Sequence, residues 1–215
     1  MKERNKLIIA IIAVALIVIV VVGATYAYWQ WTSNSAQNTA VTFTVPNKDA
    51  QLSASLKGGG STTVNNLAPA ACTNSTYAMM KPLLLTYANN TDQTARVKAT
   101  LTITSWTAGG TFSTGDLQHI HYAVTNSSTN CSTGTITGMT GTFPDNAGSS
   151  TVLINNQVLK NAIAAGGSAT DEPYYLWVWL DTDYEGANTG STISDPMQQL
   201  SFQLTWTGTI ENYTS

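Results

Sequence analysis

Apolar and polar residues alternate strictly along several stretches of this chain, and this period of two residues is what most constrains its fold. Between residues 97 and 103 every second side chain is apolar, and a lysine or a threonine stands between each pair. In a strand, such alternation directs one set of side chains to a core and the other to solvent. Residues 40–45, 52–56 and 200–206 have the same period. The chain is therefore predicted to build antiparallel sheets that each bury one face.

Other stretches complete a set of about seven to nine predicted strands. Residues 79–87 and 119–125 are strand candidates, and residues 152–154 are short and apolar. Residues 174–180 are apolar on both faces, which predicts a central strand covered on both sides. Residues 157–165 are expected to form one or two helical turns. The predicted fold class is all-β, a jelly-roll-like β-sandwich preceded by an N-terminal apolar signal helix.

The start of the chain has the composition of a secretory leader. Lys2, Arg4 and Lys6 form a positively charged beginning, and residues 7–22 form an unbroken apolar run. Small residues follow this run, as they do before the cut made by signal peptidase. The chain is therefore expected to be exported and to meet signal peptidase on the way.

The expected cut falls between Ala27 and Tyr28, because Thr25 and Ala27 are small residues at the two positions that signal peptidase inspects. The alternative is an uncleaved anchor. With the two residues after it, the apolar run would span about 27 Å as a helix, just short of a bilayer core. Trp29 and Trp31 would then lie at the membrane interface. A prepilin is a weaker alternative, because no glycine precedes the apolar run.

Charge excludes one class of partner. Charged residues are only 10% of the chain, well below the roughly 25% of an average globular protein. The leader holds three of the nine basic residues and one of the twelve acidic residues, so the rest carries a net charge of −5. No basic stripe remains, and nucleic acid is not an expected partner.

Cys72 and Cys131 are the only cysteines. An even pair in an exported chain predicts one disulfide, which would join the loop before residue 79 to the Ser/Thr-rich middle of the chain. The alternative is two free thiols, which are less common outside the cytoplasm. A metal site would need more ligands than two.

No residues with the spacing of a known catalytic motif stand out, so the chain is not expected to be an enzyme. Neither a Gly-x-Ser-x-Gly elbow nor a His-Glu-x-x-His motif occurs. His119 and His121 would project from one face of a strand and could form half of a metal site. No third histidine exists, and exposed strand histidines are the favoured interpretation.

One acidic stretch resembles the first half of a calcium loop. Asp181, Asp183 and Glu185 place oxygen ligands at alternate positions, and Gly186 follows them. The residue that should close such a loop is Thr192 rather than Glu, so this is not an EF-hand. A solvated acidic turn is the favoured interpretation, with a looser calcium site as the alternative. No other cofactor is expected.

Several stretches resemble one protein family. Residues 23–29, Gly-Ala-Thr-Tyr-Ala-Tyr-Trp, are similar to the signal-peptide end of secreted proteins processed by a SipW-type signal peptidase, a group that includes the TasA and camelysin biofilm-matrix proteins. Residues 66–69 resemble the family's Asn-Leu-x-Pro turn, and residues 83–97 its strand, Asn-Asn turn and strand. Residues 199–206 resemble its closing strand, whereas residues 106–170 match nothing in it.

The resemblance implies a jelly-roll subunit that assembles into extracellular fibres. In such fibres the segment after the cleavage site can leave its own domain and add a strand to a neighbour. The segment here offers alternating apolar side chains that could complete a sheet. The candidate assembly strand consists of Trp29, Trp31, Val41, Phe43 and Val45. The alternative is that residues 41–45 form the first strand of their own domain.

These observations divide the chain into a signal peptide (1–27), an N-terminal tail that is the candidate donor strand (28–45), and a β-sandwich domain (46–215). The expected function is that of a secreted structural subunit of an extracellular fibre or biofilm matrix at the cell surface. Its expected partners are copies of itself, other matrix proteins and polysaccharide. The alternative is a secreted or membrane-anchored glycan-binding module, in which an aromatic ring stacks on a sugar. Its candidate rings are Trp177, Trp179 and Trp206.

Amino-terminal sequencing of the exported protein tests the expected processing. The sequence should begin Tyr28-Trp29, because signal peptidase cuts after the small residue Ala27. Exported protein that is recovered from the membrane with residues 1–27 attached would establish the uncleaved anchor instead.

Overall fold

The computed structural model divides the chain into two units, Met1–Gln30 and Trp31–Ser215, and all described residues lie in the second. The described residues are 32–33, 40–45, 51–65, 69, 71–72, 78–184, 197 and 200–213. The predicted leader, the cleavage site at Ala27 and Tyr28, and the side chains of Trp29, Trp31 and Glu185 lie outside them.

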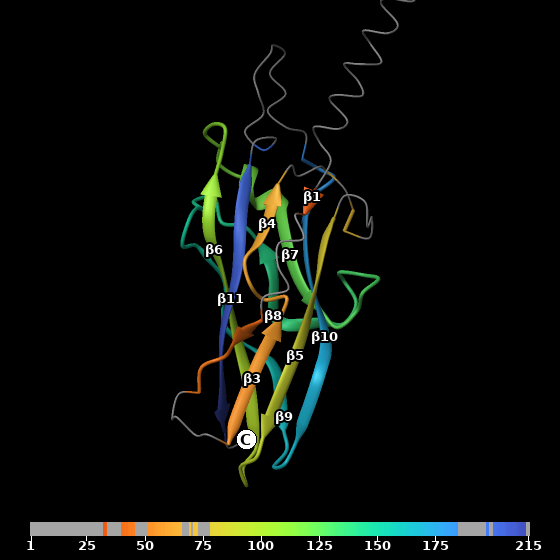
Figure 1. Ribbon diagram of the computed structural model, residues 1–215. Helices are drawn as coiled ribbons and strands as arrows, with labels where there is room; N and C mark the ends of the chain where they lie inside the picture. Colours follow the sequence, from red (N-terminus) through yellow and green to blue (C-terminus); the bar gives the residue numbers. More distant parts are fainter. Residues whose placement is uncertain are drawn as a thin grey trace, which may run out of the picture. The chain divides into compact units, whose positions relative to one another are not determined.

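The described chain folds into two antiparallel sheets (Figure 1). The first, sheet A, has the strand order β1 (Thr32–Ser33), β4 (Thr62–Asn65), β11 (Ser201–Asn212), β6 (Ala95–Thr107) and β9 (Val152–Ile163). The second, sheet B, has the order β2 (Val41–Thr42), β3 (Leu52–Lys57), β5 (Met79–Asn89), β10 (Ser168–Leu180), β7 (Ile120–Thr125) and β8 (Thr135–Thr142). A short 3₁₀ helix, η1 (Asp116–His119), precedes β7.

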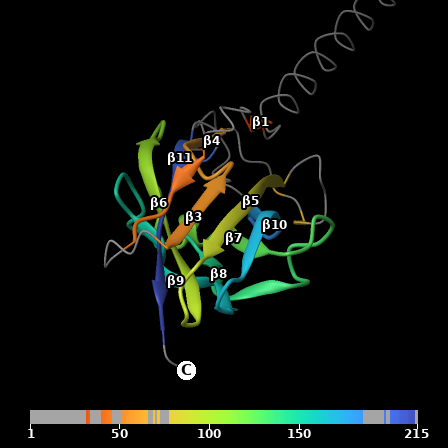
Figure 2. The same cartoon turned by 60° about the horizontal axis from the view of Figure 1, so that its bottom comes forward.

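The hydrophobic core lies between the two sheets, which Figure 2 shows from a second direction. Alternate residues of the regular strands point into it, as the period of two predicts. Sheet A contributes Leu101, Ile103, Phe202 and Trp206, and sheet B contributes Leu83, Leu85, Ile120 and Val178. The ring of Phe143, which follows β8, packs edge-on against the ring of Phe202, with the two ring centroids 5.1 Å apart. These contacts make the domain an all-β sandwich.

Most of the predicted strands are confirmed. The stretches 52–56, 79–87 and 97–103 lie within β3, β5 and β6, and all but the first residue of 200–206 lies within β11. Residues 174–180 end the central strand β10, which lies between β5 and β7. On the outer face of β10, however, only Trp177 is fully covered, and its neighbours Tyr175 and Trp179 are partly exposed.

The helical turns predicted at residues 157–165 are wrong, because residues 157–163 belong to β9 and residues 164–165 follow it outside any helix. The regular alternation of a strand is absent here because the register between β6 and β9 shifts repeatedly. Asn156 and Ala162 have positive φ angles of 50° and 52°, which mark these irregularities. Each bulge inserts a residue and so breaks the period of two.

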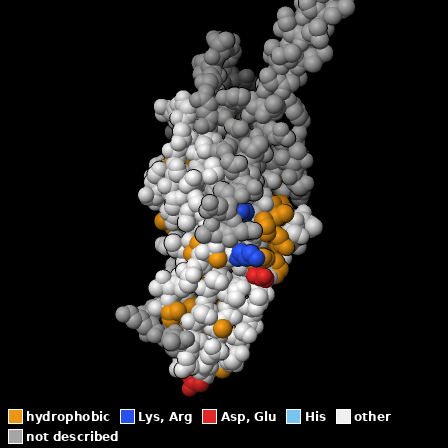
Figure 3. Space-filling view, viewed as in Figure 1, with side chains coloured by type: hydrophobic (Ala, Val, Ile, Leu, Met, Phe, Trp, Pro, Cys, Tyr) orange, Lys and Arg blue, Asp and Glu red, His pale blue; other side chains and the backbone are white. Residues whose placement is uncertain are grey.

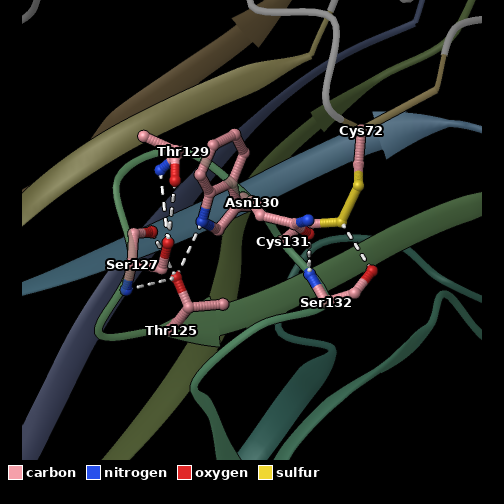
Figure 4. The surroundings of a disulfide bond; sticks show 8 residues. Cys72, Thr125, Ser127, Thr129, Asn130, Cys131 and Ser132 are labelled. Atoms are coloured by element: carbon pink, nitrogen blue, oxygen red, sulfur yellow. Dashed lines mark hydrogen bonds between the residues drawn. A yellow bond between two sulfur atoms is a disulfide. The ribbon is translucent and has the colours of Figure 1, made fainter.

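The predicted disulfide between Cys72 and Cys131 is present, with the two Cα atoms 6.1 Å apart (Figure 4). Its sulfur atoms pack against Trp177 on the outer face of sheet B. The indole Nε1 of Trp177 donates to the hydroxyl of Thr125 at 2.9 Å. The bond therefore fastens two loops over a buried tryptophan on the side of the sheet that faces away from the core.

Removing this disulfide should destabilise the domain. Replacing both cysteines by alanine frees a loop of 59 residues in the unfolded chain, and the free energy of unfolding should fall by about 4 kcal/mol. Urea denaturation followed by tryptophan fluorescence measures the change. A difference below about 1 kcal/mol would mean that the bond constrains the unfolded state little.

Candidate functional site

Residues 40–45, the described part of the predicted tail, pass from one sheet to the other. Val41 and Thr42 pair with Leu56 and Ser55 of β3, and the Phe43 N–H donates to the Ala54 carbonyl at 2.9 Å. The next residue joins sheet A, where the Thr44 N–H donates to the Gly208 carbonyl at 2.8 Å. The Thr44 carbonyl accepts from the Ile210 N–H at 3.0 Å in a parallel bridge. We call this segment, residues 40–45, the closing segment.

Phe43 anchors the closing segment. Its side chain is only 3% exposed, and its ring lies over the backbone of Gly208 in β11. A Cβ atom at Gly208 would come within 2.9 Å of the Phe43 ring and 2.5 Å of the Lys98 carbonyl oxygen. No larger residue fits here without movement, so the glycine forms the floor of the phenylalanine site.

The other predicted assembly residues have different environments. Val41 and Val45 are half-buried on either side of Phe43. The described part of the tail therefore pairs with its own domain, which is the alternative arrangement considered above. The role of Gly208 was not predicted from the sequence. A glycine inside an alternating strand is nevertheless a signal that another group approaches the backbone closely.

The two histidines do not converge on one point. The His121 Nε2 lies 3.3 Å from a carboxylate oxygen of Asp181, and its ring stacks on Trp179 at 5.1 Å. The His119 ring instead lies 5.4 Å from that of Tyr184. Among the described residues no group of three or more His, Cys, Asp or Glu side chains is placed to hold a metal ion.

The acidic turn after β10 is tied together by its own hydrogen bonds. The Asp181 carboxylate accepts from the Asp183 N–H at 3.2 Å and faces His121 with its other oxygen. Burial alone would raise the pKa of Asp181, but this hydrogen bond and the nearby His121 outweigh it and bring the pKa below its ordinary value. Calcium binding by Asp181, Asp183 and Glu185 stays a prediction.

Two of the three tryptophans considered for sugar stacking are buried. Trp177 and Trp206 are each 2% exposed, so neither ring can meet a ligand without a rearrangement. Trp179 is partly exposed, and the His121 ring covers part of it. The interpretation of Trp177 and Trp206 as stacking platforms is therefore wrong, because the disulfide covers the first and the core encloses the second.

Charged residues make two local networks. Lys160 of β9 pairs with Glu172 of β10 at 2.8 Å, and the Tyr174 hydroxyl donates to the same carboxylate oxygen at 2.9 Å. This links the edge of sheet A to sheet B. Burial raises the pKa of Tyr174, and the Glu172 carboxylate raises it further.

On sheet A, hydrogen bonds from Lys98 and Arg96 hold the pKa of Glu211 below its ordinary value. Both networks are structural, since each charge has a protein partner.

Comparison with known protein families, with curated proteins and with solved structures finds no match to this chain. No helix within the described ranges is both long and apolar enough to cross a membrane.

The Phe43 site can be tested by two substitutions. Phe43→Ala should lower the free energy of unfolding by about 3 kcal/mol, because it empties a buried aromatic site. Gly208→Ala should cost about 1–3 kcal/mol through overpacking of the same site. Thr42→Ala, at an exposed neighbouring position, is the control and should change stability by less than about 0.5 kcal/mol. Equal effects of Phe43→Ala and Thr42→Ala in urea denaturation would contradict the anchoring role.

Proposed function

We propose that this protein is a structural subunit of an extracellular fibre or biofilm matrix, and that it assembles by donor-strand exchange after its leader is removed. The observation that carries the proposal is the closing segment. It is a short extended piece of chain that completes two sheets at once and inserts one aromatic anchor into a formed site. An identical segment from a second copy would find the same backbone partners.

The bonding pattern supports exchange. The closing segment is held by backbone hydrogen bonds to Ala54, Gly208 and Ile210, and by the burial of Phe43. Each of these contacts can be made equally well by the segment of a neighbour, because the residues are the same. The choice between self-pairing and exchange then depends on the connecting chain and on the protein concentration, as in domain swapping.

The arrangement of the remaining strands supports the view that the domain tolerates exchange. Strands β1 and β2 lie at the outer edges of the two sheets, and β3 separates β2 from β5. Strands β4 to β11 pair with one another in both sheets without help from the tail. The segment can therefore leave without interrupting the pairing of these eight strands.

We also propose that the sandwich is a jelly roll. Along the chain, the strands from β4 to β11 fall in sheets A, B, A, B, B, A, B and A, and they form the four-strand orders β4-β11-β6-β9 and β5-β10-β7-β8. This alternation between sheets is what a jelly roll requires, since it folds a pair of long antiparallel ribbons over each other. The disulfide is consistent with the proposed extracellular location.

Deleting residues 28–45 tests the proposal. The shortened protein should remain folded, with an unchanged β-sheet circular dichroism spectrum, but should no longer form fibres in electron microscopy. A synthetic peptide of residues 28–45 should bind to it, because its sheets then lack their closing segment. The same peptide carrying Phe43→Ala is the matched control and should bind at least about tenfold more weakly. Normal fibres from the shortened protein would rule out strand exchange.

A further inference from the structure

Part of the outer face of sheet B, over β5 and β10, is apolar where solvent-facing strand positions are usually polar. Leu83 and Leu85 of β5 are fully buried against the core, so the residues that alternate with them face outward. These outward residues are Pro82, which pairs with Tyr175 of β10, and Leu84, which pairs with Pro173. Met80, the next outward residue, is 36% exposed. We call Met80, Pro82, Leu84, Pro173 and Tyr175 the apolar band.

Figure 3 shows hydrophobic side chains gathered over β5 and β10. The outer face of sheet A is different. Its central positions carry threonines that pair across strands, Thr102 with Thr205 and Thr100 with Thr207. This is the polar surface expected of a solvated antiparallel sheet. A contiguous apolar patch on one face, beside a polar one on the other, indicates a surface that is covered in use.

Two opposite charges border the apolar band. Lys57 of β3 pairs with Leu84 on one side, and Asp171 of β10 lies on the other, and both residues are exposed. Figure 3 shows basic and acidic side chains beside the hydrophobic ones. Asp171 has a φ of 55° at a bulge in β10, and its N–H donates to the Thr86 hydroxyl at 3.1 Å. Within the described part of the chain, neither charge has an ion-pair partner.

We propose that the outer face of sheet B binds the same face of a second copy of this protein. The charges determine the arrangement. A two-fold axis that runs along β5, in the plane of the contact, brings Lys57 opposite Asp171 of the partner subunit, and the reverse pair forms by symmetry. The same axis places the apolar residues of β5 against their own counterparts. Such an isologous contact is self-complementary. An apolar patch alone would not fix the relative orientation of the two subunits, whereas the paired charges do.

The contact is small. The apolar band extends about 14 Å along β5 and crosses two neighbouring strands, β5 and β10, that are about 4.8 Å apart. A single pair of subunits is therefore held weakly, and repetition along a polymer would strengthen the contact. The surface lies on β3, β5 and β10, so it does not rest on strand exchange and exists in the isolated subunit as well.

Cysteine cross-linking of the exported protein tests the contact. Leu84→Cys places a thiol beside the proposed axis, where it meets its own counterpart, and both native cysteines are already joined in a disulfide. Mild oxidation should yield a covalent dimer on a denaturing gel. Thr207→Cys, at an exposed position on sheet A, is the matched control and should yield none. Fibres held by exchanged strands dissociate in the denaturing gel, so the dimer reports this contact alone.

Charge reversal tests the arrangement within the Leu84→Cys background. Lys57→Glu or Asp171→Lys alone should lower the dimer yield at least about tenfold at limiting concentration, because each change creates two like-charge pairs per dimer. A mixture of the two variants should recover the yield, since opposite charges then face each other. Absence of the Leu84→Cys dimer at millimolar concentration, an equal yield from Thr207→Cys, or no effect of charge reversal would each overturn the proposal.

Discussion

The side of β11 that faces away from β6 is the constraint on which the closure of this domain depends. One edge of β11 pairs with β6 along its whole length, but its other edge meets β4 over only four residues. Beyond them, the Trp206 N–H donates to the Gly59 carbonyl at 3.1 Å, and the Ile210 N–H donates to Thr44. One long strand is thus completed by separate pieces of chain, because buried backbone groups must find partners. The closing segment is the last of these pieces along β11.

This constraint explains why the short closing segment contributes to the pairing of both sheets. A sandwich of two sheets leaves edges on both sides, and exposed edges invite pairing with other chains. The closing segment covers part of these edges within the molecule, because it forms backbone hydrogen bonds to both β3 and β11. It does so with few residues and one anchor, so its attachment is local. A segment that completes the sheets and is attached only locally is suited to exchange between identical molecules.

The sequence predicts the regular parts of this fold and misses the irregular ones. In β6, the alternation of Val97, Ala99, Leu101 and Ile103 gives the strand and its buried face directly, because no bulge interrupts these residues as they pair with β11. In β9 the bulges break the alternation, so no period of two marks residues 157–163 as a strand. The four-residue strand β4 has too few residues for any period to appear, and it lies in a stretch without strong strand signals. The alternation of apolar and polar residues reflects the direction of the side chains. It disappears wherever a bulge shifts the pairing of the strands.

The candidate sites show the same division. Cys72 and Cys131 were paired correctly because the chain holds only two cysteines. Burial of Trp177 could not be foreseen, because it depends on where the disulfide lies over the sheet. The site of Phe43 depends on Gly208, more than 160 residues away along the chain, and only the pairing of strands brings the two together.

The closing segment bonds to the edge strand β3 of sheet B and to β11 of sheet A, whereas the apolar band lies on the outer face of sheet B. This separation has a physical consequence. Exchange replaces residues 40–45 by an identical segment, so the backbone of β3 keeps the same partners on both sides. The outward positions of β3, β5 and β10 are then unchanged, including the side chains of Lys57 and Asp171. Growth by the proposed strand exchange would act along the sheet edges, whereas the proposed contact through the apolar band would act perpendicular to the sheet. The two contacts can therefore form independently, and their combination would join fibres side by side without a second protein.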